Sequence, residues 1–191
     1  MRTAVLVVLA LALPALAQAN PIPLNDIYIS FDPAGSRMHE ITPEPGTTVS
    51  AYVVVDQSEL GTNGFTTVAF KLSHPVEDFP GSFSSAEFTN LLPGAIGIGE
   101  WHEGIVMAAT ECMQWPVVVG QLDCFYLGGP ASICIEDHPE HWHMVTDCND
   151  PAQTVPYDTP ANGMIAGGDG DCDPGAPVEN VTWGVIKALY R

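Results

Sequence analysis

Hydrophobic and polar residues alternate along several short stretches of the chain, which run through residues 27–31, 49–55, 68–72 and 118–126. Because successive side chains of a strand point to opposite faces, each run predicts a half-buried β-strand. Residues 95–107 are also strand-like. Clusters of Gly, Pro and Asn separate these runs, as turns do. The pattern predicts an all-β fold, an antiparallel β-sandwich of the Ig-like or jelly-roll-like kind.

The first nineteen residues follow another pattern. Met1-Arg2 is positively charged, residues 4–13 are all apolar, and Ala17-Gln18-Ala19 is a small-residue cleavage pattern. This order is that of a secretory signal peptide, and the apolar run is shorter than the roughly 20 residues that a membrane-spanning helix needs. We therefore expect residues 1–19 to be removed on export and residues 20–191 to form one domain.

The last ten residues have helical rather than strand periodicity. Trp183, Ile186, Leu189 and Tyr190 recur at helical spacing, which predicts one short helix. A helix of this length does not hold its shape alone in water, so it needs a surface to pack on.

Charge narrows the classes of partner. The chain has 23 acidic and 5 basic side chains, a formal net charge of −18. Nucleic acid is excluded as a natural partner because phosphate binding requires a basic surface, and attraction to an anionic membrane is disfavoured for the same reason. Hydrophobic residues make up 46% of the chain and charged ones 15%, a composition too apolar for a disordered acidic tail.

Five cysteines follow the signal peptide, so disulfides are expected in the oxidising compartment that export leads to. Cys124 shares a strand face with apolar residues, a usual position for a buried free thiol. The other four lie at strand ends or in loops. We predict the pairs Cys112–Cys134 and Cys148–Cys172, the second tying a tail of about residues 150–191 to the domain.

One histidine cluster has the composition of a metal site. In an extended segment His141 and His143 project to one side, and His138 joins them around the turn at Pro139. Neutral imidazoles bind Zn²⁺ or Cu²⁺, and the neighbouring carboxylate of Asp137 or Glu140 would complete the set. The alternative interpretation is a polar surface loop, since the spacing matches no established zinc signature.

An acidic, glycine-rich stretch at residues 168–175 resembles the start of a calcium loop, with carboxylates at alternate positions. Pro174 occupies the place where such loops require Gly, and no Glu follows at the twelfth position. The favoured interpretation is a surface turn. We thus expect no cofactor, with zinc and calcium as the ions that the two clusters would take.

No catalytic constellation emerges from the sequence. Trp101-His102-Glu103 lacks the second histidine of a metalloprotease helix, and there is neither a nucleophile elbow nor a phosphate loop. The aromatic side chains of Tyr52, Trp101, Trp115 and Trp142 would suit a sugar platform, but burial in the core is the commoner fate of aromatic residues.

Several segments together carry a resemblance: Asp26-Ile27-Tyr28-Ile29, residues 51–55, Phe70-Lys71-Leu72 and above all the closing residues 182–191. The layout is similar to a family of secreted bacterial β-sandwich proteins with no assigned activity, whose chains end in TWGxIKALYR. The first half, from Gly46-Thr47-Thr48-Val49 to Phe70-Lys71-Leu72, also looks loosely like a cohesin-type sandwich. The resemblance implies a fold class and not a reaction.

From these features we expect an exported, non-catalytic extracellular or surface-associated module that binds a protein or polysaccharide. Two alternatives remain open. One is a metal-binding protein or metallohydrolase built on His138, His141 and His143. The other is a structural subunit of an extracellular assembly, in which Trp183–Tyr190 is the apolar docking element.

Overall fold

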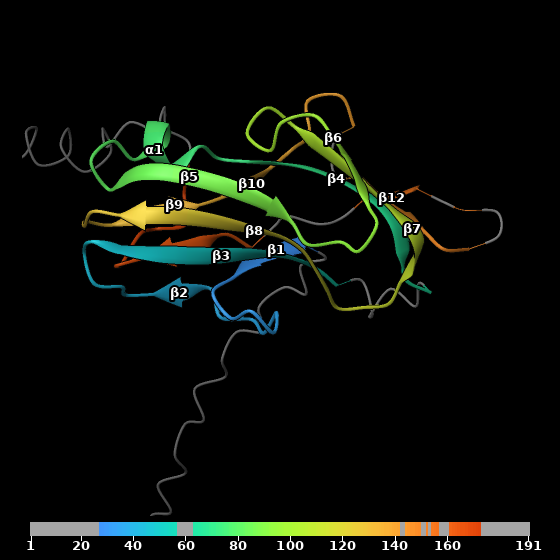
Figure 1. Cartoon of the computed structure of the whole chain (residues 1–191), viewed down its shortest axis with the longest axis horizontal. Coiled ribbons are helices and arrows are strands. Elements are labelled where there is room, and N and C mark those ends of the chain that lie inside the picture. Colours follow the sequence, from blue (N-terminus) through green and yellow to red (C-terminus); the bar gives the residue numbers. More distant parts are fainter. Residues whose placement is uncertain are drawn as a thin grey trace, which may run out of the picture.

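The computed structural model describes residues 27–56, 63–141, 144–149, 152, 154–156 and 161–172. The predicted signal peptide, the predicted helix at 182–191 and His143 lie outside the described residues. Apart from one helical turn, the regular structure of the described residues is all β-strand, and the all-β sandwich prediction is confirmed (Figure 1).

One sheet has four antiparallel strands in the order β1-β3-β8-β5, which Figure 1 shows side by side. Their bounds are Ile27–Ser30 for β1, Thr47–Val55 for β3, Val117–Tyr126 for β8 and Phe83–Asn90 for β5. The predicted alternation holds in β3 and β8, where Ala51 faces Leu122 and both side chains are buried. Three of the predicted strands therefore lie in this sheet.

The second sheet has six strands in the order β12-β11-β4-β7-β6, with β10 paired to β4. Their bounds are Thr154–Pro156, Met144–Asp147, Phe65–Leu72, Ile105–Met113, Ile96–Ile98 and, for β10, Ile135–Glu136. The single stretch expected at residues 95–107 is thus two strands, β6 and the start of β7. The chain turns sharply between them, because Gly99 and Gly104 both have positive φ, and a Cβ on Gly99 would lie 2.2 Å from the Gly104 carbonyl oxygen.

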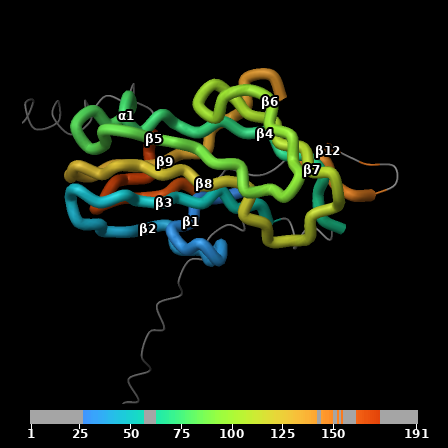
Figure 2. The backbone as a smooth tube through the Cα atoms, in the orientation of Figure 1, coloured from blue at the N-terminus to red at the C-terminus, as the bar shows by residue number. Residues whose placement is uncertain are grey.

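Three short strands form a further sheet, β2 (Glu40–Ile41), β13 (Gly163–Ile165) and β9 (Ala131–Ile133). The β13–β2 pair is parallel, whereas β13 and β9 are antiparallel. The one described helix, α1 (Pro75–Asp78), is a single turn that begins with a proline. Figure 2 follows the chain through these layers. No helix of the described residues has the length and apolarity to cross a membrane.

The core lies between the two large sheets. Phe70 of β4 is fully buried and meets Phe88 of β5 edge to face, with ring centroids 6.3 Å apart. Gly120 of β8 makes room for this contact, because a Cβ there would lie 2.2 Å from the Phe88 ring. The other buried core side chains come from strands of both sheets, among them Val49, Val53, Phe65, Val68, Met107, Val119 and Val145.

The disulfides correct the predicted pairing. The bridges are Cys112–Cys148 and Cys134–Cys172, and Cys124 is free and buried, as expected. Strand order explains the difference. Both β7 and β11 flank β4, so the ends of these two strands bring Cys112 and Cys148 together.

The second bridge has a different cause. β13 is antiparallel to β9 and ends beside Ala131, and the following residues run back along β9, where the Gly170 N–H donates to the Ser132 Oγ, so that Cys172 reaches Cys134. The free thiol behaves as the periodicity indicated: burial raises the pKa of Cys124 to about 12, so it stays protonated as a small hydrophobic side chain.

Candidate functional site

Part of the outer side of the six-stranded sheet carries no charge. On the six-stranded sheet, strand register sets two rows of outward side chains side by side. No charged residue occurs among the nine described positions of these two rows, which we call the uncharged face: Thr67, Ala69, Ile96, Ile98, Val106, Ala108, Met144, Thr146 and Thr154. The next row on the same side of the sheet carries the Lys71–Glu136 ion pair, and Ala69, in the middle of the face, is only 3% exposed. The four-stranded sheet, in contrast, carries Asp123 and Glu87 in register on its outer side. In a chain with 23 acidic residues, the uncharged face is therefore a distinct part of the surface.

Apolar exposure on the uncharged face is greatest at its edge. Ile96 and Ile98 of β6 are each 65% exposed, and β6 is the last strand of its sheet. Natural edge strands are commonly protected by charged residues or proline. The sequence of β6, Ile-Gly-Ile, holds neither. The edge thus offers two large aliphatic side chains and an open strand to a binding partner.

A hollow of about 280 Å³ adjoins this edge. Ile98 and Val106 line it on the side of the uncharged face, and the carboxyl-bearing side chains of Glu100, Glu103 and Glu140 line it elsewhere. We call it the acidic hollow. It combines apolar contact area with negative charge at one end of the uncharged face, an arrangement that suits a partner with both apolar and basic side chains.

Two of the three predicted metal ligands, His138 and His141, also line the acidic hollow, with ring centroids 4.8 Å apart. His138 is buried, and its Nδ1 accepts the backbone N–H groups of Glu140 and His141, each at 3.1 Å. A Cβ on Gly104 would lie 3.0 Å from the His138 Nε2, so this side of the ring faces backbone. Burial lowers the pKa of His138, and His141 lowers it further.

This geometry gives His138 a structural role, closing the turn that follows it. No group of three His, Cys, Asp or Glu side chains in the described ranges has an arrangement that could hold a metal ion. His143 lies outside those ranges, so the three-histidine site remains a prediction.

The surface turn favoured for residues 168–175 over a calcium loop also remains a prediction, because the stretch is described only as far as Cys172. Within it, the Asp169 Oδ1 accepts the Asp171 N–H at 3.0 Å, as in an acidic surface turn. The Gly170 N–H donates a hydrogen bond to the buried Ser132 Oγ at 3.0 Å. These bonds, with the Cys134–Cys172 bridge, fix the turn by contacts within the protein itself.

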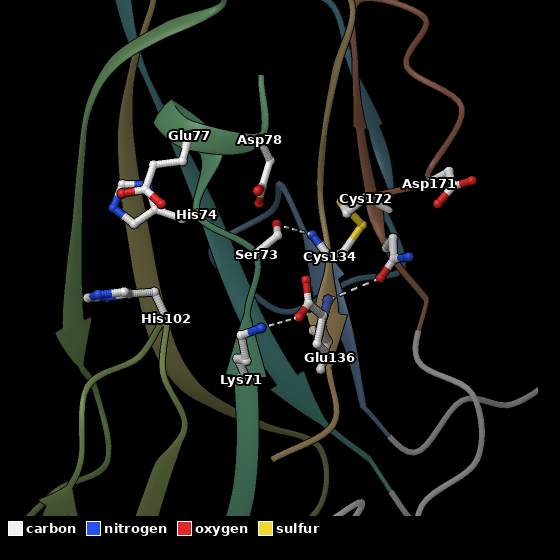
Figure 3. Close-up of a pocket in the computed structure, with 12 residues that line it drawn as sticks. Lys71, Ser73, His74, Glu77, Asp78, His102, Cys134, Glu136, Asp171 and Cys172 are labelled. Carbon is white, nitrogen blue, oxygen red and sulfur yellow. Dashed lines mark hydrogen bonds and ion pairs between the residues drawn. A yellow bond between two sulfur atoms is a disulfide. The ribbon is translucent and has the colours of Figure 1, made fainter. Parts of the chain in front are cut away.

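A larger hollow of about 530 Å³ lies beside α1 and the Cys134–Cys172 bridge (Figure 3). Lys71 and Glu136, one on each of two paired strands, form an ion pair of 2.5 Å at its wall. His74 stacks on Trp101, with centroids 5.3 Å apart, and meets His102 edge to face at 5.1 Å. The neighbouring residues His102 and Glu103 do not share a site, because His102 lines this hollow and Glu103 lines the acidic hollow.

Asp78, which lines the larger hollow, is expected to lower stability at neutral pH. Burial raises the pKa of this carboxyl group, and nearby Glu136 acts in the same direction. A raised folded-state pKa favours the protonated form, so its contribution to stability is present at low pH and is lost as the pH rises. Asp78→Asn should therefore raise the melting temperature at pH 7 and have little effect near pH 3.

Asp32→Asn is the matched control. Hydrogen bonds from Ser36 and Ala34 lower the pKa of Asp32, so this substitution should lower the melting temperature at pH 7. Thermal unfolding of both variants at the two pH values tests this; a pH-independent effect of Asp78→Asn would contradict it.

The aromatic side chains considered for sugar binding do not form a common platform in the described structure. Trp115 stacks on Phe65, with centroids 5.0 Å apart, and Trp101 stacks on His74. Both tryptophans pack against the core, whereas Tyr52 lies on β3. Trp142 lies outside the described residues.

Sequence reasoning missed the uncharged face. A signal for it was present, because residues 91–99 and 104–110 hold no charged residue in a strongly acidic chain. Those runs predict apolar strands, but not which of their side chains face solvent. That depends on the order of the strands, which leaves β6 at an edge.

Comparison with known proteins gives similarities in structure only. No protein family model matches the chain, and no curated protein matches it. Among solved structures, the sixth cohesin from Acetivibrio cellulolyticus scaffoldin B, determined in complex with a Cel5 dockerin mutant, has 15% identity and a TM-score of 0.48, over 74% of this chain and 96% of that one. A cohesin module from a Clostridium perfringens family 33 glycoside hydrolase has 9% identity and a TM-score of 0.49, over 74% and 94%. The non-cellulosomal cohesin of Archaeoglobus fulgidus has 11% identity and a TM-score of 0.41, over 74% and 88%. The cohesin-like resemblance indicated by the sequence is thus met again among solved structures.

Proposed function

We propose that this protein is an exported, non-catalytic binding module whose partner is another extracellular protein, and that the uncharged face is the surface that contacts it. The observation that carries the proposal is the pair of neighbouring uncharged rows that ends at the exposed Ile96 and Ile98, in a chain of net charge −18. The centres of protein–protein interfaces are depleted of charged residues in the same way.

A protein partner suits this face better than a polysaccharide. The exposed groups at its edge are the aliphatic side chains of Ile96 and Ile98. Their removal from water on binding is favourable, but they offer no hydrogen bond to a sugar hydroxyl. Trp101 and Trp115, the aromatic residues in the described chain that would best stack on a sugar ring, pack instead against the core. An open strand edge also allows main-chain hydrogen bonds to an extended peptide.

Export is supported by the signal-like residues 1–19 and by two disulfides, which persist in oxidising compartments. We assign no reaction to the protein. Ser73, the serine at the larger hollow, is buried, and its Oγ accepts the Cys134 N–H at 2.9 Å, which is a structural role.

Ile98→Asp is expected to weaken partner binding while leaving the fold intact, because Ile98 is 65% exposed and a charge there must be desolvated on contact. The mature chain would be immobilised and used to capture partners from the culture medium of the producing organism, followed by affinity measurement with the purified partner. We expect a loss of affinity of at least about tenfold.

Thr89→Asp is the matched control, because Thr89 is exposed on a strand of the other sheet and lies in register with Gln121. It introduces the same charge on the opposite side of the sandwich and should leave the affinity unchanged. Equal affinities for wild type and Ile98→Asp would show that the partner, if one is captured, binds elsewhere.

A further inference from the structure

We infer that the partner of this protein binds as an extended segment that pairs with the open edge of β6 and places a lysine or arginine side chain in the acidic hollow. The inference rests on the proposed function, since it names the form and the chemistry of the partner at the same surface.

The edge of β6 is open to strand pairing. In the described part of the chain β6 pairs with β7 alone and ends the order of its sheet. Alternate residues of an edge strand direct their N–H and C=O groups away from the sheet, where a further strand can bond to them. A Cβ on Gly97 would lie 3.6 Å from Cδ1 of the buried Ile105, so Gly97 faces the core. Its neighbours Ile96 and Ile98 therefore face outward, and a strand added at this edge would contact both.

Side-chain contacts have to supply much of the affinity, because β6 is only three residues long and offers few main-chain bonds. Ile98 and the following Gly99 line the acidic hollow, so the hollow begins where β6 ends. A residue opposite Ile98 on an added strand would lie about 4.8 Å away, the spacing of neighbouring strands. A lysine or arginine at that position can lay its apolar stem on Ile98 and extend its charge into the hollow.

The charge of the acidic hollow calls for a cation from outside. Its glutamates, Glu100, Glu103 and Glu140, are all exposed. The two ion pairs between described residues involve none of these glutamates, and neither pair lies at this hollow. Three carboxylates gathered in one hollow repel each other, and a cationic group placed among them relieves that repulsion. The bound segment is therefore expected to be basic as well as apolar.

A second copy of this chain does not suit the same edge. Symmetric pairing of two copies would place β6 against β6, and the sequence Ile-Gly-Ile supplies no basic residue to either hollow. It would also bring together two chains that each carry a net charge of −18. Charge complementarity thus favours a different, basic chain.

The test uses the full mature chain and, as the probe, heptapeptides selected on it from a random phage-display library. The Ile98→Asp chain serves to remove peptides that bind elsewhere. The remaining peptides should alternate aliphatic and polar residues and should contain a lysine or arginine. The tightest one is then labelled with fluorescein, and its affinity is measured by fluorescence anisotropy.

The charge of the hollow is tested by substitution. Glu100→Gln combined with Glu103→Gln should weaken peptide binding at least about tenfold, and the difference should shrink at high salt. Glu44→Gln combined with Glu87→Gln is the matched control, because it removes the same charge from exposed positions outside the hollow. The control should leave the affinity within about twofold of wild type.

Two N-methylated forms of the same peptide test the strand pairing itself. A strand directs the N–H groups of alternate residues to one side, so only one alternate set bonds to β6. Methylation of that set should abolish binding, whereas methylation of the other set should affect it far less.

Four results would overturn the inference: no peptide left after removal on the Ile98→Asp chain, selected peptides without a basic residue, an affinity unchanged by Glu100→Gln with Glu103→Gln, and equal effects of the two methylated sets. The captured partner separates this failure from that of the proposed function. A partner whose binding is weakened by Ile98→Asp but not by the two glutamine substitutions overturns only the basic, extended form inferred for it.

Discussion

Phe70→Ala is expected to lower the free energy of unfolding by about 3–5 kcal/mol, the cost of removing a buried aromatic ring and leaving a cavity. Phe70 is fully buried in β4 and packs edge to face on Phe88 of the opposite sheet. Its loss therefore removes a contact between the two sheets as well as buried area. Gly120 of β8, which lies against the Phe88 ring, has no side chain that could refill the space.

Urea unfolding followed by circular dichroism measures this effect. Phe125→Ala is the matched control, since Phe125 also lies within a strand but is 37% exposed on the outer side of the four-stranded sheet. The control should lose far less stability than Phe70→Ala. A loss below about 1 kcal/mol for Phe70→Ala would contradict the position of this ring in the core.

Removing the Cys134–Cys172 bridge with the double change to serine should cost about 4 kcal/mol, the loop-entropy estimate for the 38-residue separation of the two cysteines. The bridge anchors residues 166–172, which follow β13, to the strand that pairs with it. Its loss should therefore release this segment while β3 and β8 stay paired. The stability is measured by calorimetry.

Cys124→Ala is the control, since the Cys124 thiol is buried and unbridged. It should cost far less than the loss of the bridge and should leave both disulfides in place. A non-reducing peptide map of the wild-type chain checks the premise directly. Peptides linking Cys112 to Cys134, or Cys148 to Cys172, would contradict the strand order on which the observed pairing rests.

The strands were predictable because their determinants are local. Alternation from residue 49 to 55 and from 118 to 126 reflects one buried face, and the structure places β3 and β8 there. The identity of the free cysteine was predictable for the same reason, since Cys124 shares its face with Leu122. Features that depend on a single strand and its period could thus be inferred from sequence.

The disulfide pairing and the uncharged face depend on which strands lie together, and no local pattern contains that information. Cys112 and Cys148 meet only because β7 and β11 both pair with β4. Likewise, Ile96 and Ile98 are exposed because β6 ends a sheet, although their sequence is as apolar as that of a buried strand. The role of His138 was also hidden, because its bonds to the following N–H groups require the turn geometry.

Hydrogen–deuterium exchange of the protein with and without its captured partner is the measurement that tests the binding face most directly. We expect the partner to slow exchange in peptides that cover β6 and the first half of β7, residues 96–98 and 105–109, and to leave β5 and β8 unchanged. Protection confined to β5 and β8, with none on β6, would contradict the proposal that the uncharged face is the contact surface.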